Sequence, residues 1–189
     1  MITGERLLRF RCTGCGNCCK EPLLPLTDAD LRALVRHTGE SAHEIVSWVD
    51  RFGIDMAGEP EAFVVLRQGR RVMTLAHRRG GCRYLDPADR CTVYSARPMG
   101  CRVFPFDPTF SKRDGSLRRL ALIPAAECLY ELDGENDPAR LRELHARHLR
   151  AIDAYHARVK EWNLAQRRRR RAGKAAETAR AFLAYLGFA

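Results

Sequence analysis

The sequence has no apolar run of about 18 residues, the length that a membrane-spanning helix needs. Its first twenty residues also lack an apolar stretch of about 7–15 residues between a basic start and a small-residue cleavage site, so no secretory signal peptide is predicted. Charged residues make up 30% of the chain, which favours a soluble protein. We therefore expect a cytoplasmic protein with no membrane partner.

Motifs that identify the common nucleotide-binding and hydrolytic enzymes are lacking as well. No G-x-G-x-x-G stretch follows a predicted strand and opens a helix, and there is no P-loop. The zinc-protease motif H-E-x-x-H and the nucleophile motif G-x-S-x-G are also missing. The sequence therefore predicts no particular reaction, and whether the protein is an enzyme stays open at this stage.

Cysteine, in contrast, is abundant and unevenly spaced. Four cysteines fall within the stretch CTGCGNCC near the N-terminus and four more follow, so that the set is Cys12, Cys15, Cys18, Cys19, Cys82, Cys91, Cys101 and Cys128. An even number of cysteines suggests disulfides in a secreted protein. Thiols stay reduced in the cytosol, however, and clustered thiols there more often hold metal. We predict that all eight cysteines are metal ligands.

The spacing of the N-terminal cysteines indicates the kind of metal. Thiolates are soft donors, which suit Zn²⁺ and iron–sulfur iron rather than Mg²⁺ or Ca²⁺. Cys12, Cys15 and Cys18 repeat a C-x2-C step in the manner of a bacterial cluster-binding run. Cys19 departs from that run and is a candidate ligand of a second metal. Eight thiols make two tetrahedral sets, or one larger cluster with spare thiols, and the sequence does not pair them.

The stretches C-x2-CGNCC, GCRYLD and RCTVYSARPMGCRVFP, with a late cysteine, resemble the CxxCxxCC cysteine-cluster family, the YkgJ-like proteins described as zinc- or iron-chelating. The resemblance extends over residues 8–130, and its RP-x2-CR-x-FP portion is the most specific. The last cysteine of the family often precedes Pro-Gly, whereas Cys128 precedes Leu129 and Tyr130. The resemblance implies binding of zinc, iron or an iron–sulfur cluster, and it implies no particular reaction.

Arginines beside the cysteines are the second set of candidate site residues. Four thiolates around Zn²⁺ or a [4Fe–4S]²⁺ cluster leave a net negative charge, and its burial is costly unless cations oppose it. Arg97 and Arg102 flank Cys101 in the sequence and are predicted to contact the cofactor. The alternative is that these two side chains bind loop carbonyls or a carboxylate.

Two short helices are predicted after the first cysteine group. The capping-box pattern T-x-x-D from Thr27 opens a helix over 28–37. The pattern S-x-x-E from Ser41 opens a second helix over 43–52, and Gly53 ends it.

Two hairpins and a long helix complete the predicted elements. The stretch 63–75 and the stretch around 113–116 are typical of β-hairpins. Asp137 as N-cap, with Pro138 at the first helical position, opens a long C-terminal helix. The predicted fold class is α+β, with a single small cysteine-rich metal-binding domain over residues 1–136. Residues 137–189 are predicted to form a basic helical extension packed on that domain.

The positive charge of the chain is concentrated in this extension. The net charge is +10, and residues 137–189 account for +8 of it with 13 Lys and Arg against 5 Asp and Glu. The run of five arginines at 167–171 is interpreted as a solvated helix end. The alternative is a patch that binds the phosphates of nucleic acid or anionic lipid, although no motif that reads nucleic-acid sequence accompanies it.

Two functions of different classes follow from these features. The first is a metal-binding protein that coordinates an iron–sulfur cluster (4Fe–4S), zinc or both, with a redox or accessory role beside an unidentified protein partner. The alternative is an interaction module in which zinc is structural and the basic C-terminal helix binds an anionic partner.

Overall fold

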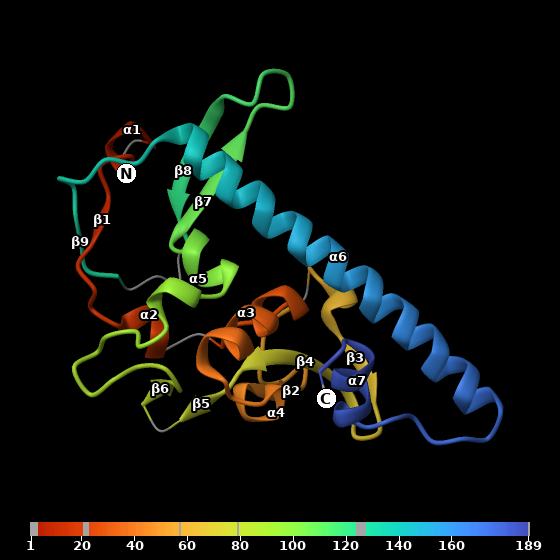
Figure 1. The fold of residues 1–189 in the computed structure, drawn as a ribbon. Coiled ribbons are helices and arrows are strands. Elements are labelled where there is room, and N and C mark those ends of the chain that lie inside the picture. Colours follow the sequence, from red (N-terminus) through yellow and green to blue (C-terminus); the bar gives the residue numbers. More distant parts are fainter. Residues whose placement is uncertain (1–3, 21–22, 57, 79, 124–127, 189) are drawn as a thin grey trace. The chain divides into compact units, whose positions relative to one another are not determined.

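The computed structural model describes residues 4–20, 23–56, 58–78, 80–123 and 128–188. Its helices and antiparallel strands form an α+β fold (Figure 1). The chain divides into two compact units, and each unit is made of two separated stretches of sequence. Unit 1 contains Met1–Pro22 and Arg78–Arg150, and unit 2 contains Leu23–His77 and Ala151–Ala189. The boundary predicted after residue 136 falls inside unit 1.

The helices are short, with one exception. Unit 1 contains α1 (Gly4–Leu7), α2 (Asn17–Lys20), the 3-10 helix η2 (Tyr94–Ala96) and α5 (Met99–Val103). Unit 2 contains α3 (Asp28–Thr38), α4 (Ala42–Ile45), the 3-10 helix η1 (Pro60–Ala62) and α7 (Ala179–Tyr185). The exception is α6 (Pro138–Arg171), a continuous helix whose residues up to Arg150 belong to unit 1 and whose later residues belong to unit 2.

The strands pair in small antiparallel sheets. Unit 1 pairs β1 (Arg11–Cys12) with β9 (Tyr130–Glu131), and β7 (Phe106–Phe110) with β8 (Leu117–Leu122). Unit 2 has one three-stranded sheet in the order β2-β4-β3, formed by β2 (Val46–Val49), β3 (Val64–Leu66) and β4 (Gly69–Leu75). The strands β5 (His77–Arg78) and β6 (Gly81–Cys82) have two residues each.

The first predicted helix is confirmed together with its caps. The Thr27 hydroxyl accepts a hydrogen bond from the Asp30 amide at 3.2 Å, and the Asp30 carboxylate accepts one from the Thr27 amide at 3.1 Å. This reciprocal pair satisfies two amides at the start of α3. Gly39 ends the helix with φ of +71°, a left-handed conformation that favours glycine.

The second predicted helix is wrong over most of its length. The cap at Ser41 is present, but α4 ends at Ile45 and the chain continues as β2. β2 pairs with β4 from Val46 opposite Leu75 to Val49 opposite Val72. The segment VSWV is rich in β-branched and aromatic residues, which fit a pleated sheet, and pairing with β4 therefore overrides the local helical pattern.

Both predicted hairpins and the long helix are confirmed. In the first hairpin β3 and β4 pair on either side of a tight turn, where Gly69 has φ of +107°. In the second, β7 and β8 flank the turn at 113–116. The Asp137 carboxylate accepts a hydrogen bond from the Ala139 amide at 2.9 Å and caps α6, which continues through the whole arginine run.

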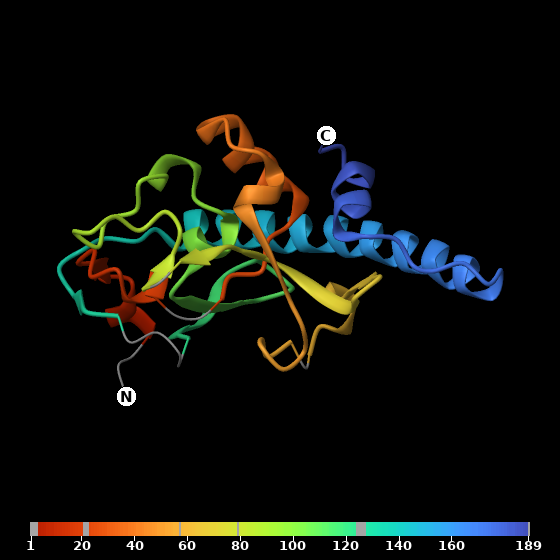
Figure 2. The same cartoon turned by 90° about the horizontal axis from the view of Figure 1, so that it is seen from below.

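Unit 2 contains most of the apolar core. Phe182 of α7 is fully buried and packs edge-on against Trp162 of α6, with ring centroids 5.1 Å apart. The two helices lie side by side, as Figure 2 shows for α7 and the later part of α6. Among the described residues and with proline left aside, twenty buried hydrophobic residues belong to unit 2 and five belong to unit 1, namely Leu7, Phe10, Tyr84, Val93 and Leu120.

Asn163 joins α6 to the backbone of unit 2 around β3. Its side-chain oxygen accepts a hydrogen bond from the Val65 amide at 2.7 Å, and its side-chain nitrogen donates one to the Phe63 carbonyl at 2.8 Å. Asn163→Ala should lower the free energy of unfolding of unit 2 by about 1–3 kcal/mol, because two partly buried backbone groups lose their partners. Denaturant titration followed by tryptophan fluorescence measures this change.

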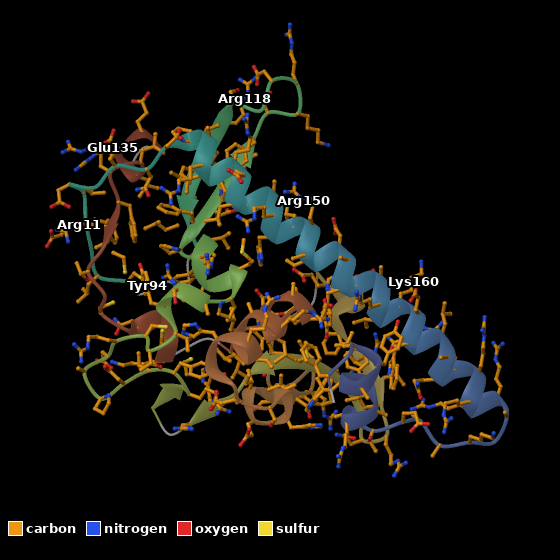
Figure 3. The ribbon with its side chains drawn as sticks, viewed as in Figure 1. Arg11, Tyr94, Arg118, Glu135, Arg150 and Lys160 are labelled. Atoms are coloured by element: carbon orange, nitrogen blue, oxygen red, sulfur yellow. The ribbon has the colours of Figure 1, made fainter. Side chains whose placement is uncertain are left out.

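The matched control is Lys160→Ala on the same helix, because the Lys160 side chain points to solvent (Figure 3). This exposed substitution should change the free energy of unfolding by less than about 0.5 kcal/mol. Equal effects of the two substitutions would show that the Asn163 bridge does not stabilise the unit.

Candidate metal centre

All eight cysteines belong to unit 1, although they come from distant parts of the chain. The structure holds them as free thiols, and it leaves Cys12 and Cys18 exposed and the other six partly buried. Cys12 lies in β1, Cys18 and Cys19 lie in α2, Cys82 lies in β6 and Cys101 lies in α5. The unit thus brings together segments that carry the cysteines but that are far apart in the sequence.

Pairing of β1 with β9 positions the first cysteines beside the last one. Cys12 lies opposite Tyr130 in this pair, and the Thr13 hydroxyl donates a hydrogen bond to the Leu129 carbonyl at 2.8 Å. Phe10, the residue before β1, packs against Tyr130 of β9, with ring centroids 5.1 Å apart. The loop that follows Cys12 is therefore fixed next to the segment that carries Cys128.

The loop after Cys12 turns back on its own thiol. The Gly14 amide donates a hydrogen bond to the Cys12 sulfur at 3.3 Å, and Gly14 and Gly16 have φ of +74° and +71°. Glycine is favoured in this left-handed conformation because it has no Cβ atom. Gly14 and Gly16 thus allow the tight turns between the cysteines.

The helix α2, which carries Cys18 and Cys19, contacts the loop between Cys82 and Cys91. The Lys20 ammonium at the end of α2 forms an ion pair with the Asp89 carboxylate at 2.8 Å. A Cβ atom on Gly16 would lie 2.9 Å from the Asp89 side chain, which shows how closely the two segments approach. A Cβ atom on Gly81 would lie 2.5 Å from the Cys19 carbonyl oxygen. These three close approaches join α2 to the segment 81–89.

Electrostatic interactions connect the thiols in two groups that share Cys18. In the first group, called the Cys101 group, the charges of the neighbouring thiols act on Cys101; its members are Cys18, Cys82, Cys91 and Cys101. In the second, called the Cys128 group, Cys128 is subject to the charges of its neighbours and forms a hydrogen bond with Cys15; its members are Cys12, Cys15, Cys18 and Cys128. Cys19 adjoins the first group, with its sulfur 4.0 Å from the sulfur of Cys18.

Burial and mutual repulsion oppose ionisation of several thiols. Burial and the neighbouring thiolates raise the pKa of Cys101 to about 12, and the same two causes raise the pKa of Cys128 to about 11. The hydrogen bond between Cys18 and Cys19 lowers the pKa of Cys18 to about 6 and raises the pKa of Cys19. A bound cation removes this penalty because a coordinating thiol is deprotonated outright.

The two predicted arginines occupy different environments. Arg102 donates hydrogen bonds from its guanidinium to the carbonyls of Ser95 and Arg97. This agrees with the alternative prediction, in which the side chain binds carbonyls of the loop. The Arg97 guanidinium stacks on the exposed ring of Tyr94 at 3.7 Å from the centroid, and its charge favours the thiolates of Cys18 and Cys101. The Arg97 Nε atom is buried and has no hydrogen-bond partner in the described part of the chain.

These donors fit a soft metal in their chemistry. The set consists of sulfur atoms, which prefer Zn²⁺ or iron–sulfur iron, and Arg97 supplies an opposing positive charge. The distance of 4.0 Å between the sulfurs of Cys18 and Cys19 is close to the separation of about 3.8 Å that Zn–S bonds of about 2.3 Å give at a tetrahedral ion. Within the residues that the structure describes, no three His, Cys, Asp or Glu side chains already stand together as a formed metal site.

Two contributors to this arrangement were not predicted from the sequence. Asp89, which binds Lys20, also has a positive φ of +59°, and the DPADR stretch around it is a turn-forming composition that gives no sign of its partner. Gly81 is the second contributor. It was not predictable because its role depends on how closely the backbone of Cys19 approaches it. Both depend on contacts between segments that are distant in the chain.

The site is therefore a set of thiols within one unit, with the donor chemistry of a chelating protein. The chain belongs to the CxxCxxCC family, described as "Putative zinc- or iron-chelating domain", whose model matches residues 11–118. Seven of the eight cysteines lie inside this match, and Cys128 lies beyond it. No curated protein and no solved structure matches the chain. Within the described residues, no helix is both long and apolar enough to cross a bilayer.

Proposed function

We propose that unit 1 binds an iron–sulfur cluster through its cysteines and that the protein has a redox or electron-transfer role in support of another protein. The observation that carries this proposal is the concentration of all eight thiols in the unit with the smaller apolar core. Within the described residues, five buried hydrophobic side chains besides proline are few for a unit of this length, and small cores usually need a metal or a similar cross-link.

The Cys101 group would supply four thiolates, which is the ligand number of a [4Fe–4S] cluster. Three of its members come from the loop-rich segment 82–101 and one from the C-x2-C-x2-C run. Arg97 would oppose the negative charge of the cluster, and Arg102 would hold the loop that positions Arg97. An iron–sulfur cluster supplies one-electron transfer when it is bound.

Structural zinc is the second candidate function. It is favoured by the Cys128 group, in which the charges of three N-terminal thiols, Cys12, Cys15 and Cys18, act on a thiol from the far end of the unit. A zinc ion held there would join the start and the end of unit 1 and would stabilise the fold directly. In this case the metal fixes the loops and has no redox chemistry.

Anaerobic purification of the full chain separates these proposals. The expected result is a brown protein that contains iron and acid-labile sulfide in similar amounts, with broad visible absorption that bleaches on reduction. A colourless protein that contains only zinc would replace the iron–sulfur proposal with the structural-zinc function. A protein that retains neither metal and whose thiols are oxidised to disulfides would contradict both.

A further inference from the structure

One end of unit 2 carries a dense group of arginines that the metal centre does not use. Of the five consecutive arginines at the end of α6, Arg169 alone is bound inward, with its guanidinium 2.7 Å from the Glu177 carboxylate and 3.2 Å from the Ala175 carbonyl. The others are exposed, and no ion pair is formed by them within the described residues; they are Arg167, Arg168, Arg170 and Arg171. The inward contacts of Arg169 thus anchor the helix end and leave its neighbours facing solvent.

A second segment, distant in the sequence, adds to the same charge. The backbone amide of Arg67, in the turn between β3 and β4, donates a hydrogen bond to the Glu177 carbonyl at 2.7 Å. The Arg67 guanidinium also donates to the Ala176 carbonyl at 3.4 Å. Because Glu177 binds both Arg169 and Arg67, the β3–β4 turn and the end of α6 form one surface. We call this surface the basic end; it comprises Arg67, Arg167, Arg168, Arg170, Arg171 and Lys174.

We propose that the basic end binds the phosphate backbone of double-stranded nucleic acid without regard to sequence. Arginine presents a planar fork of donors that matches a phosphate group in two hydrogen bonds. The exposed arginines occur at i, i+1, i+3 and i+4, so they point around the helix end and suit a polyanion that follows a curved surface. This structure thereby favours the alternative for residues 167–171 over a simply solvated helix end, since a second segment extends the charge.

A lipid surface fits the basic end less well. The segment 167–175 contains no large apolar side chain, whereas helices that lie on membranes bury an apolar face at the level of the headgroups. Binding at the basic end therefore depends on charge alone, and its affinity should depend strongly on the salt concentration. The inference does not rest on the metal centre, which belongs to unit 1.

The experiment measures binding of the full-length, metal-loaded protein to a fluorescently labelled DNA duplex by anisotropy at several salt concentrations. For wild type, the logarithm of the affinity should fall linearly with the logarithm of the salt concentration, at about 0.9 per phosphate contacted. Changing the four exposed arginines together to glutamine removes four cations and keeps helix propensity. This variant should bind at least tenfold more weakly, with a salt slope smaller by about 3–4.

The matched control removes four exposed cations from unit 1 instead, as Lys112→Gln, Arg113→Gln, Arg118→Gln and Arg147→Gln (Arg118 is labelled in Figure 3). It has the same net charge as the first variant and should keep a wild-type slope. Equal slopes in the two variants would overturn the proposal, because binding would then follow net charge rather than the basic end. Binding to phosphatidylserine vesicles with no binding to the duplex would also overturn it.

Discussion

Replacing Cys101 with serine is expected to release metal and to destabilise unit 1 in the same step. Serine has nearly the same size as cysteine, but its hydroxyl is a poor ligand for a soft metal. Because metal binding contributes directly to folding in such sites, loss of a ligand lowers stability as well as metal content. A loss of about 3 kcal/mol would lower the midpoint of thermal unfolding of unit 1 by roughly 12–24 °C, the scale for a domain of about 60–100 residues. Metal analysis and thermal unfolding measure the two effects on the same sample.

The tryptophans make this measurement specific to one unit. The chain has two tryptophans, Trp48 and Trp162, and both belong to unit 2. In Cys101→Ser, tryptophan emission should stay native while limited proteolysis begins to cut unit 1. The control compares wild type and variant after chelation, where their stabilities should converge because the metal is absent from both. An unchanged metal content would contradict a ligand role for Cys101.

Replacing Gly81 with alanine is expected to reduce metal content although no ligand is changed. The new Cβ atom would lie 2.5 Å from the Cys19 carbonyl oxygen and 2.8 Å from the Lys20 Cα atom, and neither is the end of a flexible side chain. Gly81 also has φ of +132°, a conformation that is nearly restricted to glycine. Backbone strain and the steric clash together should cost about 2–6 kcal/mol, and α2 should move away from β6.

Gly80→Ala is the matched control for this substitution. Gly80 is the preceding residue and has φ of +93°, but a Cβ atom there would meet nothing within 4 Å. This variant should show only the backbone cost of about 1–3 kcal/mol and should keep its metal. If Gly80→Ala and Gly81→Ala lose the same amount of metal, close packing of Cys19 on Gly81 is not what holds the site together.

Elements with strong local signals were predictable from the sequence. The caps of α3 depend on Thr27, Asp30 and Gly39, which all lie within or beside the helix, so their effect can be read locally. The hairpin over 63–75 and the N-terminus of α6 were predictable for the same reason. β2 was not, because the choice between helix and strand for VSWV depends on β4, which follows more than twenty residues later.

The candidate site was predictable in composition but not in arrangement. The CTGCGNCC stretch and the later cysteines indicated a thiol site, and the family match agrees with a zinc- or iron-chelating domain. The division into a Cys101 group and a Cys128 group depends on the β1–β9 pair and on the close approach of α2 to Gly81. Such contacts between distant segments leave no periodic pattern in the sequence. The ligand roles of the eight cysteines stay predictions until metal is measured.

Because unit 1 is made of two separated stretches of sequence, its cysteines are synthesised at different times. Its two stretches are separated by the first stretch of unit 2, so Cys12, Cys15, Cys18 and Cys19 leave the ribosome long before Cys128. At translation rates of about 5–20 residues per second, this interval is roughly 5–20 s. During that time the early thiols are exposed on a nascent chain that still lacks its later cysteines, and oxidation or capture of the wrong metal competes with correct assembly. Cells that are short of reductant should therefore accumulate incorrectly loaded protein first among newly made chains, while completed molecules remain intact.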